Sequence, residues 1–130
     1  TFVNTSELNA GIPQAGNEIS TMNAGYITMV LTKMVNEFAG TPLEQMALNA
    51  VNAQASFIIS SLQDSNGGFY NGYVLNDGPA SSAKTALSQA AAARGLYAAY
   101  SLTNNSDYLN AANAAYDYLI SPFYVASQHA

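Results

Sequence analysis

Apolar residues recur at three- and four-residue steps from Glu18 onward, which is the spacing of one face of an α-helix. The members of this stripe are Ile19, Met22, Tyr26, Met29, Val30, Met34 and Phe38. Gly40 follows at the position where a helix commonly ends in a left-handed residue. The pattern predicts a helix over residues 18–38 with this stripe buried.

A second helix is predicted over residues 42–62, directly after a short turn. Thr41 is placed to cap it, and Pro42 suits its first turn. Glu44 is placed to reach back to the Thr41 amide, which completes a capping box. Because a connection this short joins antiparallel neighbours, residues 18–62 are expected to form a helical hairpin.

Residues 63–80 break the helical pattern, and they contain Asn-Gly twice, a sequence typical of turns with positive φ. Helical spacing returns over residues 82–102, capped by Ser81 or Ser82, and over 107–121, ended by Pro122. The first of these helices is so rich in Ala that it is expected to lie in the interior. Together they predict a second hairpin.

The two hairpins resemble each other: at an offset of 61 residues, residues 48–60 align with 109–121, and large apolar positions coincide. A hairpin that recurs at such a spacing is typical of an α-repeat. We therefore predict an all-α fold of about four helices. Residues 1–16 are expected to be an irregular arm. Residues 17–130 are expected to be one domain of two antiparallel hairpins, 18–62 and 82–121, joined by the loop 63–80.

Two stretches resemble the repeat units of α/α-toroids, the architecture of several glycoside hydrolases, polysaccharide lyases, sugar epimerases and terpene cyclases. Gln63, Gly67, Gly68 and Phe69 are similar to the Gln-x-x-x-Gly-Gly-aromatic turns that follow outer helices in these folds. Residues 95–112 are similar to an inner helix, a turn and a Tyr-Leu-x-x-Ala outer helix. The resemblance covers residues 42–121 and implies toroid-like hairpins. A closed toroid needs more hairpins than two, so the chain is either part of a longer enzyme or a small bundle with the same local pattern.

The charge pattern argues against some classes of partner. Only 8% of the residues are charged, the net charge is −5, and Lys33, Lys84 and Arg94 are the only Lys or Arg residues. Three scattered cations cannot neutralise a nucleic acid backbone, so a nucleic acid partner is not expected. No apolar run is long enough for a membrane span. The uncharged polar composition favours an extracellular or cell-surface location, and no cofactor or metal site is predicted.

Two carboxylates flank the aromatic part of the loop. Acid–base chemistry on sugars needs a pair of carboxylates at close range, and Asp64 and Asp77 are the candidates for catalytic residues. The alternative is that both residues only form turns.

Four residues are candidates for ligand binding. Phe69, Tyr70 and Tyr73 offer aromatic faces on which a sugar ring can stack, unless the loop folds back and the rings close the end of the bundle. Arg94, the only Arg, can hold an anionic substrate group through a bidentate contact. Its alternatives are a structural ion pair with an Asp or a side chain that extends to solvent.

Three functions compete at this stage. The first is a portion of an extracellular, carbohydrate-acting α/α-toroid domain of hydrolase, lyase or epimerase type, with a carbohydrate ligand and the remainder of a longer chain as its partners. The second is a self-assembling structural subunit that forms homo-oligomers, because low charge weakens the repulsion between copies. The third is a small helical module that binds a ligand through its loop aromatics. The local sequence pattern favours the first.

Overall fold

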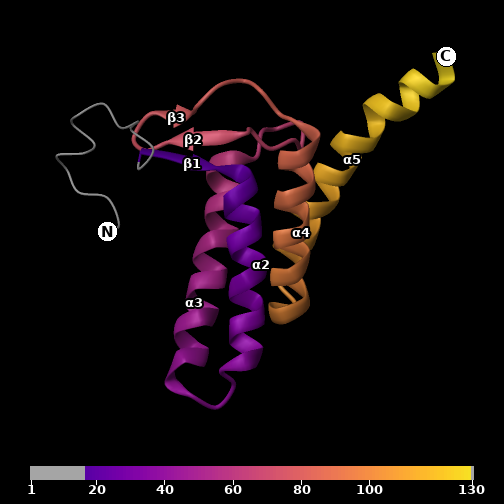
Figure 1. Ribbon diagram of the computed structural model, residues 1–130. Coiled ribbons are helices and arrows are strands. Elements are labelled where there is room, and N and C mark those ends of the chain that lie inside the picture. Colours follow the sequence, from indigo (N-terminus) through magenta and orange to yellow (C-terminus); the bar gives the residue numbers. More distant parts are fainter. Residues whose placement is uncertain (1–16, 130) are drawn as a thin grey trace.

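The computed structural model describes the backbone of residues 17–129 and the side chains of residues 17–120 (Figure 1). The predicted arm, residues 1–16, lies outside the described residues. The elements are β1 (Glu18–Ser20), α2 (Thr21–Glu37), α3 (Pro42–Phe57) continued by the π-helical turn η2 (Ile58–Leu62), β2 (Gly72–Val74), β3 (Gly78–Pro79), α4 (Ala86–Thr103) and α5 (Ser106–His129). The predicted all-α class with four helices is confirmed, with a small antiparallel sheet added.

Helices α2 and α4 lie side by side and run in the same direction, while α3 packs on α2 and α5 packs on α4 (Figure 1). The direction follows from the contacts. The early residue Gly25 of α2 approaches Ala91 of α4, and the late residue Asn36 lines a depression with Ser101. Each hairpin therefore contributes one helix to a central pair and one flanking helix.

The predicted buried stripe is confirmed only in part, since Ile19 and Met34 are partly buried against the core and other members are not. Met22, Tyr26 and Val30 are exposed, with 63% of Tyr26 accessible to solvent. The residues that α2 buries are instead small or hydroxylic, apart from one Val: Thr21, Ala24, Gly25, Thr28, Thr32 and Val35.

Close approach of the two central helices explains this choice of face. A Cβ atom on Gly25 would lie 2.2 Å from the Ala91 carbonyl oxygen, and one on Gly95 would lie 2.6 Å from the Gly25 carbonyl oxygen. Large side chains do not fit between backbones at this separation. The Thr28 hydroxyl is satisfied within its own helix, because it donates to the Ala24 carbonyl at 2.7 Å.

The sheet gathers at the end of the bundle where α2 and α4 begin (Figure 1). Strand β2 pairs antiparallel with both β1 and β3. Glu18 was expected to begin a helix, but it opens β1, and the helix starts only at Thr21. Ser20 caps α2 by accepting from the Asn23 amide at 3.3 Å. The Thr21 amide donates to the Asn71 carbonyl, which ties α2 to the loop.

Helix α3 begins at Pro42 as predicted, but its predicted capping box is not formed. Gly40 adopts a φ of 82° as expected, and Thr41 makes no side-chain cap, because its hydroxyl donates to the Phe38 carbonyl. The Glu44 carboxylate accepts from the Gly40 amide and not from that of Thr41. Helix α4 begins at Ala86 and not at 82, because Thr85 provides the cap.

Pro122 does not end α5, which continues to His129. A proline within a helix has a helical φ and loses one hydrogen bond to the preceding turn, so the helix can continue at that cost. The last part of α5 extends beyond the other helices (Figure 1). None of the four helices, over the residues described, is long and apolar enough to cross a membrane.

Candidate functional site

The loop 63–71 lies on α5 and is fixed by its first residues. The Gln63 amide nitrogen donates to the Gly67 carbonyl at 2.9 Å and to the Ala111 carbonyl at 3.0 Å. Gly67 has a φ of 91°, and a Cβ there would lie 2.8 Å from the Ala114 carbonyl oxygen. The glycine in the pattern that resembles toroid turns therefore allows the loop backbone to lie against α5.

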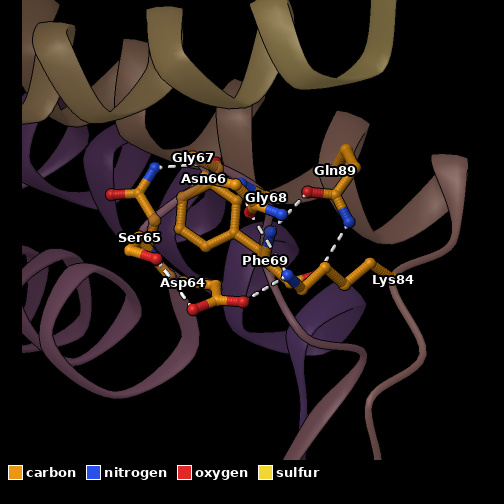
Figure 2. Close-up of polar contacts among 9 residues, drawn as sticks. Asp64, Ser65, Asn66, Gly67, Gly68, Phe69, Lys84 and Gln89 are labelled. Carbon is orange, nitrogen blue, oxygen red and sulfur yellow. Dashed lines mark hydrogen bonds and ion pairs between the residues drawn. The ribbon is translucent and has the colours of Figure 1, made fainter. Parts of the chain in front are cut away.

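Phe69 is fully buried, and both of its backbone polar groups bond to one side chain (Figure 2). Its amide donates to Gln89 Oε1 at 2.6 Å, and Gln89 Nε2 donates to its carbonyl at 2.7 Å. The ring belongs to the core with Ile58, Leu62 and Leu96. In this structure the Phe69 ring presents no face to solvent.

Tyr70 and Tyr73, the other two predicted stacking residues, are partly buried. The Tyr73 ring packs edge-on against Phe57, with ring centroids 5.6 Å apart. The Tyr70 ring lies beneath the Lys84 ammonium group, 4.8 Å from its centroid. A role of either ring in ligand binding stays a prediction.

Asp64 forms an ion pair with Lys84, at 2.6 Å between Oδ2 and Nζ (Figure 2). The hydrogen bond from Lys84, followed by those from the Ser65 amide and Tyr70, lowers the pKa of Asp64 to about 2. The same carboxylate raises the pKa of Tyr70. The Lys84 side chain is only 9% exposed and also lies 5.6 Å from the centroid of the Tyr118 ring.

The two predicted catalytic carboxylates occupy different settings. Asp64 is held ionised by Lys84, so at neutral pH it can bind a cation but has no proton to donate. Asp77 is exposed in the turn between β2 and β3, where its amide donates to the Val74 carbonyl. No contact joins the two carboxylates within the described residues, and the catalytic assignment of both stays a prediction.

Arg94 is exposed on α4, as in the alternative of a side chain that extends to solvent, and its role in ligand binding stays a prediction. Helix α4 buries one face, formed by residues such as Ala92, Leu96 and Ala99, and leaves the opposite face open. The expected ion pair with an Asp is not formed within the part of the chain whose side chains are described, and Asp64 is occupied by Lys84.

An open depression of about 250 Å³ lies beside Arg94, between α2 and α4. Its lining residues are Met29, Thr32, Lys33, Arg94, Tyr97 and Ala98. Of these, only Arg94 was singled out from the sequence. Lys33 interrupts an apolar stripe that was assumed to be buried, so the signal for an exposed face was present but was interpreted as core.

A larger depression of about 500 Å³ lies on the other side of the molecule, between α3 and α5. Its lining combines apolar surface, from residues such as Ile59 and Ala111, with the polar residues Ser56, Gln63 and Asp107. The Tyr108 hydroxyl donates to Asn52 Oδ1 at 2.6 Å and so joins the two helices. Across the described residues, no group of three His, Cys, Asp or Glu side chains is arranged to hold a metal ion.

Residues 64–124 match the protein family described as D-glucuronyl C5-epimerase C-terminus. The matched segment starts at Asp64, includes β2, β3 and α4, and ends within α5. It spans just under half of the chain, and α2 and α3 lie outside it. No curated protein matches the chain. The second half is therefore similar to a sugar-epimerase domain, which agrees with the sugar-epimerase branch of the expected resemblance.

Proposed function

We propose that this chain is a portion of a carbohydrate-acting domain of the epimerase type, built as an α/α-toroid in which α2 and α4 are neighbouring inner helices. The match of residues 64–124 to the C-terminal region of D-glucuronyl C5-epimerases carries the proposal. The arrangement of the helices supports it, because two parallel central helices, each followed by a flanking helix, are the unit from which such a barrel is assembled.

The two outer edges of the molecule support the toroid. Ile27, Leu43 and Met46 are exposed on the α2/α3 hairpin, and Tyr116 and Ile120 are exposed on α5. Burying one such side chain contributes about 1.5–3 kcal/mol, so further hairpins packed against either edge would be stabilised by these residues. We propose that these edges join neighbouring hairpins of the same barrel.

Epimerisation requires a sugar site with two opposite walls, and in this proposal the chain provides one of them. To invert a carbon that carries a hydrogen, a base must remove the proton from one face of the sugar and an acid must return one to the other face. Two groups on opposite walls are therefore needed. In this proposal the exposed face of α2 and α4 is one wall of the sugar site, and other hairpins provide the facing wall.

The location is part of the proposal. We propose that the domain works outside the cell or at its surface, on the basis of its composition: 8% charged residues and a surface formed largely by uncharged polar groups. Detection of the native protein in the secreted or surface fraction supports this, and detection only in the cytosol contradicts it.

The decisive measurement is the covalent mass of the native protein, by intact mass spectrometry, together with its mass in solution by light scattering. A covalent mass well above 13.6 kDa is expected, because the barrel needs more hairpins. An uronate-containing oligosaccharide incubated with the native protein in D₂O should then gain deuterium at the inverted carbon. A native covalent mass near 13.6 kDa contradicts the proposal.

Self-assembly is the second candidate, and the same exposed edges favour it. Copies of the chain that stack edge to edge would cover Ile27, Leu43 and Met46 of one copy with Tyr116 and Ile120 of the next. Such a contact joins different surfaces and generates rings or filaments. A covalent mass of 13.6 kDa in a large regular assembly is the result that this candidate predicts. The same mass in a monomer favours a small ligand-binding module.

A further inference from the structure

Two of the three cations of this acidic chain lie in one depression between α2 and α4. Lys33 comes from α2 and Arg94 from α4, and the two side chains line the same open concavity. The third cation, Lys84, precedes α4 and is paired with Asp64. We call this concavity the Lys33–Arg94 depression, with Met29, Thr32, Tyr97 and Ala98 as its other lining residues.

The local charge is opposite to that of the chain as a whole. The net charge is −5, yet among residues 17–120 no acidic side chain lines the depression. Glu37 follows Lys33 by one turn of α2, but neither Lys33 nor Arg94 forms an ion pair within residues 17–120. Two like charges at one concavity repel each other, and an anion placed between them removes this repulsion while gaining two attractive contacts.

The flanks of the depression are firm and partly apolar. The Tyr97 hydroxyl donates to Asn113 Oδ1 at 2.6 Å, and its ring meets the Tyr116 ring edge-on, with centroids 6.5 Å apart. Tyr97 is thereby fixed from α5, and Met29 comes from α2. A sugar unit presents both an apolar ring face and polar edges, so an aromatic flank beside two cations suits a sugar that also carries an anionic group.

We propose that the Lys33–Arg94 depression is an anion subsite that takes the carboxylate of an acidic sugar unit. Arg94 binds the carboxylate through its planar fork, and Lys33 adds a point charge from the opposite helix. The two residues thus determine the preference for an acidic over a neutral sugar. This inference rests on the proposed function, since it identifies the part of the sugar-binding face that selects the ligand.

The experiment measures binding of a D-glucuronate-containing oligosaccharide and of its carboxyl-reduced, neutral counterpart to the native protein and its variants by titration calorimetry. Arg94→Gln and Lys33→Gln are each expected to weaken binding of the acidic oligosaccharide about tenfold, because each removes a charged contact. Arg94→Lys keeps the charge but loses the fork, so its affinity should fall between those of Arg94→Gln and the original chain. Asn110→Asp changes the net charge by the same amount at the separate depression between α3 and α5, and serves as the matched control. Thermal unfolding confirms that each variant folds.

Each outcome supports or overturns a specific claim. Tighter binding of the acidic oligosaccharide, lost in Arg94→Gln and Lys33→Gln, retained in Asn110→Asp and weakened by added salt, supports the subsite. Equal binding of both oligosaccharides by all variants overturns the subsite and leaves the carbohydrate-acting function in place. Binding of neither oligosaccharide counts against the proposed function itself. Equally strong binding of sulfate or inorganic phosphate without any sugar overturns the assignment to a sugar carboxylate.

Discussion

The α2/α4 contact and the loop 63–71 both bring backbone against backbone through glycines, but they are held together differently. At the helix pair, Gly25 and Gly95 leave room for two helices, and the contact depends on shape alone. In the loop, Gly67 permits the approach to α5, and polar groups of Gln63, Asp64 and Gln89 then fix the chain. The first region should therefore respond to added volume, and the second to lost hydrogen bonds and to pH.

The largest effect is expected where the loop enters the core. Phe69→Ala removes a fully buried ring and should lower the free energy of unfolding by about 3–5 kcal/mol, from lost burial and a cavity. Urea denaturation followed by circular dichroism measures this. Tyr26→Ala, which truncates an aromatic residue on the exposed face, should change stability by less than about 1 kcal/mol. Similar losses in both variants would contradict the burial described here.

Added side-chain volume at the α2/α4 contact is expected to have the next largest effect on the free energy of unfolding. Gly25→Ala places a methyl group 2.2 Å from a backbone oxygen, so the helices must separate, at a cost of about 1–3 kcal/mol. Gly95→Ala acts at the same contact. Once one substitution has separated the helices, the second meets less resistance, and the double variant should lose less than the sum of the single variants. Additive losses would show that the two glycines do not share one contact.

Loss of the Gln89 clamp on Phe69 should lower the stability by a comparable amount. Gln89→Ala leaves the buried amide and carbonyl of Phe69 without their partner, which costs about 1–3 kcal/mol. Gln45→Ala is the matched control, since it removes only an exposed bond to Asn49. Hydrogen exchange should show faster exchange of the Phe69 amide in Gln89→Ala. An unchanged exchange rate would contradict the clamp.

The smallest effect is a pH-dependent change in stability, which is expected in the loop and not at the helix pair. The pKa of Asp64 is lowered from 3.8 to about 2, so its ionised form is favoured by folding, and the resulting stability is present above about pH 4 and lost as the pH falls through about 2. Asp64→Asn should therefore be less stable than the original chain at about pH 7, with the difference vanishing near pH 2. Gly25→Ala should show a pH-independent difference. Acid titration of the thermal midpoint for both variants tests this.

The helices could be predicted from the sequence, but most of the face that α2 buries could not. The period of apolar residues located α2 well, yet the larger residues Met22 and Tyr26 face solvent while Gly25 and Thr28 are buried. A sequence pattern ranks residues by hydrophobicity, whereas a contact between two helix backbones selects residues by size. Helix α4 was expected to lie in the interior because of its Ala content, but it buries only one face, and Arg94 lies on the other.

At the loop, composition indicated turns but not the partners of the side chains. Gly67 and Gly68 were recognisable as turn residues, and the resemblance to toroid turns came from them. The ion pair of Asp64 with Lys84 and the clamp of Gln89 on Phe69 each join residues 20 positions apart. Such pairings depend on where α4 begins relative to the loop. The sequence pattern placed the start of this helix at residue 82, whereas α4 begins at Ala86, so the pairings could not be predicted.

The π-helical turn η2 at the end of α3 determines which changes in chain length the fold tolerates there. Ile58 and Leu62, its first and last residues, are both fully buried, and Gln63 comes directly after them with its bonds to Gly67 and Ala111. A wide turn holds one residue more than an α-helical turn would. Deletion of a single residue from 58–61 would therefore let the segment rewind as an α-helix with Gln63 in nearly the same direction. A residue inserted into the regular part of α3 has no such compensation and would rotate the start of the loop by about 100°, so that Gln63 faces away from both carbonyls. Near the end of α3, a deletion within η2 should therefore be tolerated better than an insertion before it.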